Sequence, residues 1–458
     1  MKVLLINPPQ PIFDKDPENL AVSWPMGILY VAAATKRAGH DVRILDVYVN
    51  GCIPHIMFNG NHNIWYTSQL LQNLEGGFTD DGLVGLGNEF LDSVLGDGKP
   101  DIIGISLMFS SIHYTVPVFV DFVKRIVPNA IIVLGGAHAS IAASELLELD
   151  AVDYVIMGEG EVAFPGLLHA IENNEPTDNI PGVYPTPFGL ISNLDDIYPP
   201  AYQMVSVDQY FAVLGRHEVV MITSRGCPFS CRFCSVPQSS YRTWRAHSVD
   251  RVLAEMEMAK TMGATDIMFE DDNMSLNKDR YCHILEAVVK QNWGLHLGTR
   301  NLLLTTLDKD VLTLMKLAGF TKVPVSAESG CDRVLAVEMG KKLTTAETER
   351  VVRESVEVGL KPFLNFVIGM PGEKRNEIDQ TADFARRMKT LGAEGFWVSV
   401  ATPIFGTAMF QELVEKNMLP PNFVHRFSYG RGTFDGPDWT KEQIQDYRKM
   451  LMEELNSR

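Results

Sequence analysis

The feature that most limits the fold is an alternation of short apolar runs with amphipathic stretches, repeated along most of the 458 residues. Such alternation is typical of βαβ units, which build parallel sheets. It occurs in two series, separated by a proline-rich stretch at 181–200. We therefore predict an α/β protein with more than one domain, each with its own core.

The first series spans residues 1–180 and predicts a doubly wound, Rossmann-like sheet. Its buried parallel strands are expected at 3–6, 42–45, 102–105, 131–134 and 154–157. The ligand crevice of such a sheet lies at the carboxyl ends of its strands. Residues 47–98 interrupt the alternation, and two interpretations stay open for them: an insertion that packs near the functional site, or a surface excursion.

The second series begins at residue 217 and contains six strand–helix pairs. Its strands are expected at 217–223, 267–271, 294–299, 322–327, 362–368 and 395–401. The expected organisation is a first domain at 1–180, a linker at 181–216, a second domain at 217–415 and a C-terminal segment at 416–458. That last segment ends in an amphipathic helix, and it either closes the substrate pocket or packs as an appendage.

Three of the six cysteines form the run Cys227-x-x-x-Cys231-x-x-Cys234, directly after the first strand of the second series. Three thiolates this close can hold three corners of a cuboidal iron–sulfur cluster, which leaves one iron open for chemistry. A structural zinc site would need a fourth ligand, and His217 or His247 could supply it. Clustered rather than paired cysteines indicate a reducing compartment, so we expect a cytoplasmic protein.

Charge and hydropathy restrict the partners. The formal net charge is −17 and no run of Lys and Arg appears, so a nucleic-acid substrate is not expected. No apolar stretch reaches the length of a membrane span, and the apolar start of the chain ends at Asn7, too early for a signal peptide.

Four segments follow the cysteine run in an order and at distances that resemble those of radical S-adenosylmethionine (SAM) enzymes with an N-terminal cobalamin-binding domain. They are Phe269-Glu-Asp-Asp-Asn273, Ala327-Glu-Ser-Gly330, Phe366-Val-Ile-Gly-Met-Pro-Gly-Glu373 and Thr402-Pro-Ile-Phe-Gly-Thr407. The resemblance covers residues 1–415, and the cysteine run is its most specific part. It implies a partial (β/α)6 barrel for the second series, with the chemistry at the carboxyl ends of the strands.

The resemblance implies a [4Fe-4S] cluster on the three cysteines and SAM on the open iron. SAM contacts are implied at Phe233, Asp272, Asn273, Arg300, Glu328, Ser329, Gly330 and Gly369. Phe233 would lie near the adenine, and Glu328 and Ser329 would contact the amino group or the ribose. Asp272 and Asn273 could instead cap the helix that follows them. Glu373 is interpreted as a residue at the start of a helix.

Cobalamin is the third implied cofactor. The first series lacks the run Asp-x-His-x-x-Gly that carries a histidine ligand to cobalt, so such a ligand is not indicated, and His113 and His138 are interpreted as hydrogen-bonded scaffolding. The lower face of the corrin would meet the loop 106–113 or the insertion. Implied contacts are Pro25, Gly27, Ser106, Ser110, Gly135, Gly136, Glu159 and Gly160.

The resemblance implies a cobalamin-dependent radical SAM methyltransferase. In such an enzyme the 5′-deoxyadenosyl radical abstracts hydrogen, and methylcobalamin then gives a methyl group to an unactivated carbon. The substrate would be a peptide or protein residue or a small metabolite, and a one-electron reductant such as ferredoxin or flavodoxin would be a partner.

Three alternatives stay open. One is an oxidative cyclase or rearrangement enzyme that uses cobalamin without methyl transfer. Another is a non-enzymatic zinc or cluster protein, in which the strand end Glu328-Ser-Gly330 would have no use. The last is a transfer-RNA methylthiotransferase, which would need further cluster cysteines, whereas Cys52 is the only cysteine before Cys227.

Overall fold

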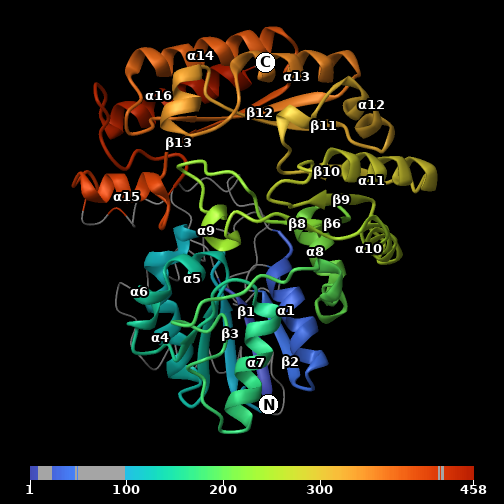
Figure 1. The fold of residues 1–458 in the computed structure, drawn as a ribbon, viewed down its shortest axis with the longest axis vertical. Helices are drawn as coiled ribbons and strands as arrows, with labels where there is room; N and C mark the ends of the chain where they lie inside the picture. The colour runs from blue at the N-terminus through green and yellow to red at the C-terminus, as the bar shows by residue number, and fades with distance from the viewer. Residues whose placement is uncertain (9–22, 47–48, 50–97, 421–422, 424–427, 458) are drawn as a thin grey trace. The chain divides into compact units, whose positions relative to one another are not determined.

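The computed structural model describes residues 1–8, 23–46, 49, 98–420, 423 and 428–457 (Figure 1). Most of the interruption expected at 47–98, with Cys52, lies outside these residues. The chain forms two compact units, Met1–Ser192 with Asp196–Gly215, and Asn193–Asp195 with Arg216–Arg458. The stretch 181–216, expected as a linker, therefore belongs almost entirely to the first unit.

The first unit contains a five-stranded parallel sheet in the order β2-β1-β3-β4-β5. Its strands are β1 (Lys2–Asn7), β2 (Asp41–Asp46), β3 (Ile102–Ser106), β4 (Ile131–Gly135) and β5 (Tyr154–Val155). The strand order reverses beside β1, as in a doubly wound fold, and this places the ligand crevice at the carboxyl ends of β1 and β3.

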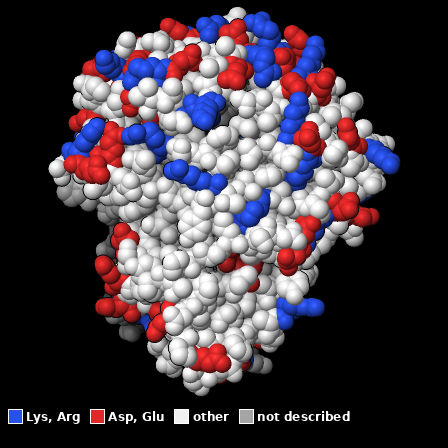
Figure 2. Space-filling model, viewed as in Figure 1, with Lys and Arg blue, Asp and Glu red and all other residues white. Residues whose placement is uncertain are grey.

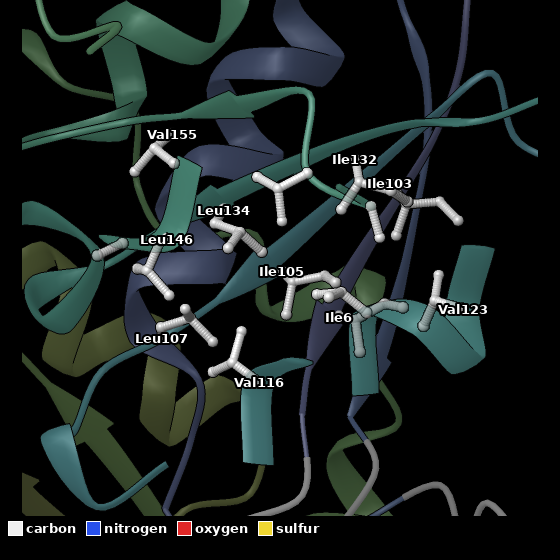
Figure 3. Packing of buried hydrophobic residues seen from close by; sticks show 14 of the residues in the cluster. Ile6, Ile103, Ile105, Leu107, Val116, Val123, Ile132, Leu134, Leu146 and Val155 are labelled. Atoms are coloured by element: carbon white, nitrogen blue, oxygen red, sulfur yellow. The ribbon is translucent and has the colours of Figure 1, made fainter. Parts of the chain in front are cut away.

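Helices cover both faces of this sheet. They are α1 (Met26–Arg37), α4 (Val116–Ile126), α5 (Ala137–Ile141), α6 (Ala143–Leu147) and α7 (Gly160–Glu172). Side chains alternate along β1, so that Leu4 and Ile6 join one buried cluster while Val3 and Leu5 join the other. Figure 3 shows the first cluster, where side chains of α4 and α6 meet those of β3 and β4. A strand buried on both faces is apolar throughout, which explains the continuous apolar runs.

The expected linker packs on the first unit through its backbone and its aromatic side chains. Tyr184 N–H donates to the Val155 carbonyl at 2.9 Å, and the Met157 N–H donates to the Gly182 carbonyl at 2.7 Å. In helix α8 (Val207–Leu214), Tyr210 stacks on Trp24 with ring centroids 4.2 Å apart. The Tyr210 hydroxyl also donates to Asp46 at 2.7 Å. These buried contacts make the stretch part of the domain.

The second unit contains six parallel strands in chain order, as two three-stranded sheets, β6-β9-β10 and β11-β12-β13. The strands are β6 (Glu218–Met221), β9 (Asp266–Phe269), β10 (His296–Thr299), β11 (Lys322–Glu328), β12 (Lys361–Ile368) and β13 (Gly395–Val400). An isolated parallel bridge between Leu297 and Phe320 connects the two sheets. The predicted series of six strand–helix pairs is present.

A helix follows each strand and lies on the outer side of the strands (Figure 1). The helices are α10 (Val249–Thr261), α11 (Lys278–Gln291), α12 (Lys309–Leu317), α13 (Thr345–Glu357), α14 (Arg375–Thr390) and α15 (Ala408–Glu415). Most of them begin at a polar side chain that accepts a hydrogen bond from the first turn, namely Ser248, Asn277, Asp308, Thr344 and Thr407.

The predicted C-terminal helix is α16 (Lys441–Asn456), and it covers the outer edge of β13. The Asn456 side chain accepts from the N–H of Phe396 and donates to its carbonyl, while Arg448 donates to the Val398 carbonyl at 2.8 Å. Unpaired groups on an edge strand invite pairing with another chain, so this helix protects the edge. The observed contacts of α16 are those of a packing element.

Figure 2 shows acidic and basic side chains interspersed on the face that it draws. Among the helices that the structure describes, none is both long enough and apolar enough to cross a membrane.

Candidate active site

The three cysteines lie in one loop, which we call the cluster loop (residues 226–235). It begins after the short strand β7 (Ser224–Arg225), precedes helix α9 (Val236–Ser240), and is closed at its base by strand β8 (Arg245–Ala246), which pairs with β7. Gly226 has φ +85°, and a Cβ atom there would lie 2.0 Å from the Thr243 carbonyl oxygen. Only glycine permits this approach, so the loop needs it before the first cysteine.

The three thiols are free, partly buried and close enough to influence one another. Burial, with a smaller contribution from the neighbouring Cys231 and Cys227, raises the pKa of the Cys234 thiol to about 12. Burial also raises the pKa of Cys227 and Cys231. Because iron binds thiolates, assembly of a cluster here must displace protons from these groups.

The arrangement fits a cluster better than a zinc ion. Within the described part of the chain, no three His, Cys, Asp or Glu side chains surround a position for a single ion. His247 contacts Asp195 at 3.1 Å, and His217 contacts the Gly263 carbonyl at 3.1 Å. A cuboidal cluster spreads its thiolates over separate corners, whereas zinc gathers four ligands around one point.

The segment after β9 holds the start of the cluster loop. The Asp271 side chain is buried and accepts from the N–H and hydroxyl of Thr223 and from the hydroxyl of Ser224. Asp272 accepts from the Gly226 N–H at 2.7 Å. Helix α11 is capped by Asn277, so Asp272 does not serve as its cap.

Two other expected SAM contacts lie beside this segment. The Asn273 side chain is hydrogen-bonded to the Cys227 thiol, and the main-chain carbonyl of Asn273 accepts from the Trp244 indole N–H at 3.0 Å. The Arg300 guanidinium lies 3.4 Å from Glu270. The structure therefore brings Asp272 and Asn273 to the first cysteine.

Glu328 ends β11 in an unusual conformation. Its φ is +60°, a value that costs a non-glycine residue about 1–3 kcal/mol and is concentrated at functional sites. Its carboxylate accepts from Lys341 Nζ at 2.8 Å, and the same ammonium donates to the Ser326 carbonyl at 2.8 Å. The Lys341 ammonium is near enough to Cys227 and Cys231 to oppose the rise in their pKa that burial causes.

Ser329 and Gly330 make contacts that favour a packing role rather than the expected contact with SAM. The Ser329 hydroxyl lies 3.0 Å from that of Thr381 in α14. A Cβ atom at Gly330 would lie 2.5 Å from Cβ of Phe384 in the same helix. Both residues therefore allow α14 to approach the end of β11.

The turn after β12 contains Gly369, which has φ +83°. Glu373 closes this turn by accepting from the N–H groups of Gly369 and Met370 at 2.7 and 3.0 Å. Burial raises the pKa of Glu373 to about 8. Glu373 directly precedes Lys374, the N-cap of α14, and its carboxyl group binds the turn that leads into this helix.

In the first unit, a chain of side chains joins the loops after β3 and β4. His138 is buried, with Nδ1 3.1 Å from the Ser110 hydroxyl and Nε2 2.9 Å from His113 Nδ1. Burial lowers the pKa of His138 to about 3, so the ring stays neutral. These contacts are those of scaffolding between two loops.

The nominated cobalamin contacts separate into two groups. Several serve the fold: a Cβ atom at Gly136 would lie 2.6 Å from the Leu107 carbonyl oxygen, and one at Gly160 would lie 2.9 Å from Val31. Ser110 is bonded to His138, and Glu159 accepts from the Ile191 N–H at 2.7 Å. These contacts already engage the four residues within the unit.

The other nominated residues lie where a large ligand has room. Among the described residues, a Cβ atom at Gly27 would meet nothing within 4 Å, and one at Gly135 would meet Ile156 at 3.9 Å. Pro25 precedes α1, and Ser106 ends β3 beside Gly135. Met108 and Phe109 follow β3 with 45% and 52% of their surface exposed. An exposed apolar edge beside open glycines fits the flat face of a corrin ring.

Comparison with known proteins assigns the family. Residues 84–168 match the model of the B12 binding domain, and residues 221–385 match that of the Radical SAM superfamily. The chain is similar to the uncharacterized methyltransferase PH0819 of Pyrococcus horikoshii, with 30% identity over 92% of this chain and 84% of that protein. The chain belongs to the cobalamin-binding radical SAM family. This confirms the resemblance found in the sequence.

The chain is also similar to two enzymes with assigned reactions. Cytidylyl-2-hydroxyethylphosphonate methyltransferase of Streptomyces wedmorensis is 26% identical over all of this chain and 90% of its own length. An anaerobic magnesium-protoporphyrin IX monomethyl ester cyclase of Cereibacter sphaeroides is 24% identical over 95% of this chain and 66% of its own.

The radical SAM methyltransferase TsrM of Kitasatospora setae, solved with cobalamin and a [4Fe-4S] cluster, has the same fold. Its TM-score is 0.67 at 19% identity, over 91% of this chain and 75% of that chain. The α/β fold class is thereby confirmed. As a family member, this chain is a radical SAM methyltransferase whose cofactors are a [4Fe-4S] cluster, SAM and cobalamin. The non-enzymatic alternative is excluded.

The sequence did not single out two residues that the structure brings to the site. Asp271 stands inside a recognised motif, but its hydrogen bond with Thr223 joins segments that are far apart in the sequence. Lys341 belongs to none of the recognised motifs. The only local feature beside it is Gly340, which has φ +64° in the structure.

Proposed function

We propose that this enzyme methylates an unactivated carbon of a peptide or protein residue or of a small metabolite, after the 5′-deoxyadenosyl radical has abstracted hydrogen from that carbon. When bound, the cluster and SAM supply this radical and cobalamin supplies the methyl group. The observation that carries the proposal is the cluster loop, in which three thiols lie together beside the charged pair Glu328 and Lys341. We propose Cys227, Cys231 and Cys234 as the ligands of three irons.

Glu328 and Lys341 are suited to bind the amino-acid end of SAM. The α-ammonium of SAM would pair with the Glu328 carboxylate, and its α-carboxylate would pair with the Lys341 ammonium. Two charge-assisted contacts would then replace the one ion pair now seen at 2.8 Å. Because both side chains are largely shielded from water, the geometry of the pair would orient the ligand strongly.

The remaining SAM contacts are assigned by position. Phe233, next to the third cysteine, would pack on the adenine, and Gly369 would leave room on the same side. Asp272 and Asn273 would hold the start of the cluster loop through the Gly226 N–H and the Cys227 thiol. Arg300, at the end of β10, would face the same mouth.

For cobalamin, we propose that the ring rests on Met108 and Phe109, with Gly27 and Gly135 leaving space for it. Pro25 and Ser106 would flank this surface at the ends of α1 and β3. The buried hydrogen bonds of His138 keep the loop after β3 in place. A ferredoxin or flavodoxin in the cytoplasm would provide the electron that radical SAM chemistry requires.

The test is turnover with methyl-labelled SAM under anaerobic reduction, with candidate substrates followed by mass spectrometry. We expect a labelled methyl product, with 5′-deoxyadenosine and S-adenosylhomocysteine in about equal amounts. Cys231→Ala should abolish both products, whereas Cys282→Ala on α11 should not. An oxidised or rearranged product without label, formed without S-adenosylhomocysteine, would favour the reaction of the cyclase relatives instead.

A further inference from the structure

Arg232 stands between the second and third cysteines and is held from three sides. Its N–H donates to the Met339 carbonyl at 2.9 Å, and its carbonyl accepts from the Met409 N–H at 2.9 Å. Its guanidinium forms an ion pair with Glu412 of α15. One residue of the cluster loop is therefore bound to two segments that lie far later in the chain.

The segment 402–407 provides another attachment. The Gln238 side chain, just beyond the cluster loop, donates to the Gly406 carbonyl at 2.8 Å. Thr407 caps α15 by accepting from the Phe410 N–H at 3.1 Å, which fixes the turn that presents Met409 to Arg232. The motif Thr402-Pro-Ile-Phe-Gly-Thr407, which the SAM contacts do not use, therefore leads into the support of the cluster loop.

The segment at Met339 also packs on the cluster loop. Gly340 has φ +64°, and a Cβ atom there would lie 3.5 Å from both the Ser230 carbonyl oxygen and the Arg232 side chain. The next residue is Lys341, which pairs with Glu328. The contact at Arg232 thus connects the cysteine turn to the proposed SAM-binding pair.

Glu412 keeps its charge in this position. Burial acts to raise its pKa, but Lys416, at 2.6 Å, and Arg232 together hold the pKa of Glu412 below its ordinary value. The carboxylate is therefore ionised at neutral pH and available to the guanidinium.

We propose that Arg232 is a positioning residue for the iron–sulfur cluster, and that Glu412 and the segment 402–409 serve to hold it. The turn from Cys231 to Cys234 lies outside the paired strands, so contacts from other segments must set the direction of its thiols. The Arg232 contacts supply this constraint and transmit it to Lys341. The inference rests on the proposed ligands Cys227, Cys231 and Cys234.

The experiment compares Arg232→Glu, Glu412→Arg and the double variant that exchanges the two charges, each reconstituted with iron and sulfide under anaerobic conditions. The rate at which a ferrous chelator removes iron is measured, together with the electron paramagnetic resonance spectrum of the reduced cluster with and without SAM. Each single variant should release iron roughly ten-fold faster, the effect of losing one charge-assisted contact. The double variant should recover most of the loss, and the SAM-induced spectral change should return with it.

Arg386→Glu is the matched control. Arg386 forms a comparable ion pair with Glu454, between α14 and α16. The variant therefore makes the same change of charge at a position that is not in the cluster loop. It should leave the iron-release rate and the spectrum unchanged. Arg232→Lys should stay close to the unmodified enzyme, because its main-chain contacts and charge remain.

Iron release from Arg232→Glu no faster than from Arg386→Glu, or a double variant no better than the single ones, would overturn the positioning role. If Arg232→Glu binds no iron, the result for Arg232→Lys decides. Four irons and a normal spectrum in Arg232→Lys would support the positioning role. Absence of iron from both variants would show that the charge at residue 232 is not what matters. An unmodified protein without iron would instead contradict the proposed ligands, so the two failures are distinguishable.

Discussion

Lys341 Nζ lies 2.8 Å from the Glu328 carboxylate at the end of β11, and its charge reaches Cys227 and Cys231. This pair joins the strand end to the cluster loop. Its two charges complement the ammonium and carboxylate groups of an amino acid, and this is the basis for assigning the amino-acid end of SAM to it.

Lys341→Met should weaken SAM binding by about 10- to 100-fold, the range expected for loss of a hydrogen bond to a charged group. Glu328→Gln should have a smaller effect in the same direction, because the amide still accepts one hydrogen bond. Affinity can be measured by titrating SAM against the spectrum of the reduced cluster. Lys342→Met, a change at the adjacent exposed lysine, is the control, and equal affinity in all the variants would contradict the assignment.

Replacing Cys227, Cys231 and Cys234 together by Ala should abolish iron binding. The unmodified chain should hold about four irons after anaerobic reconstitution, with the broad visible absorption of thiolate-bound iron. Metal analysis and absorption spectroscopy provide the check. Cys282→Ala should keep all four irons, and zinc without iron in protein purified anaerobically would argue for the structural zinc site.

Glu373 predicts a dependence of stability on pH. Its pKa is raised to about 8 by burial in the folded chain and is about 4.3 when unfolded, so the folded state holds the proton longer. The free energy of unfolding should therefore be highest below about pH 4, as far as this group is concerned, and should fall as the pH rises towards about 8.

Glu373→Gln should reduce this fall, because a neutral amide can still accept from the Gly369 and Met370 N–H groups. Between about pH 5 and about pH 8, we expect the free energy of unfolding of the variant to rise by about 1–3 kcal/mol relative to that of the unmodified chain. Denaturant unfolding of both proteins at the two ends of this pH range measures the difference. A variant as sensitive to pH as the unmodified chain would show that another group is responsible.

The apolar edge after β3 predicts how the corrin is held. Phe109→Asp should lower the amount of corrinoid retained through gel filtration by at least several-fold. A charged side chain would replace the aromatic ring, about half of which is exposed for contact with the corrin. Val162→Asp, at an exposed position on α7, should retain about one corrinoid per chain. Full retention by Phe109→Asp would remove this loop from the binding surface.

The spectrum of bound cobalamin offers a separate check on the lower face. Because the chain lacks Asp-x-His-x-x-Gly, the paramagnetic form of the bound corrinoid should show no superhyperfine splitting from a histidine nitrogen. Splitting that disappears in His113→Ala would show that this histidine is a ligand, and would contradict its interpretation as scaffolding.

Local pattern was enough to predict the strands and the order of the helices. The run at 3–6 is apolar throughout because helices cover both faces of β1. Burial on both faces favours an apolar side chain at each of these positions, so the strand can be recognised in the sequence. The cysteine spacing likewise indicated the metal chemistry, because cluster ligands within one loop must be near in sequence.

Only the tertiary structure decided which residues meet across the fold. Met339 and Met409 meet Arg232, and Asp271 meets Thr223, through contacts between segments that no local periodicity connects. The stretch 181–216 resembles a linker by composition, yet Tyr184 and Tyr210 bury it on the first unit. Gly136 resembles a ligand-binding glycine, but a Cβ atom there would lie against the Leu107 carbonyl group, so the residue has a role in packing. The sequence determined the elements and the cofactor chemistry, because these depend on neighbouring residues, whereas the role of each side chain depended on what the folded chain placed beside it.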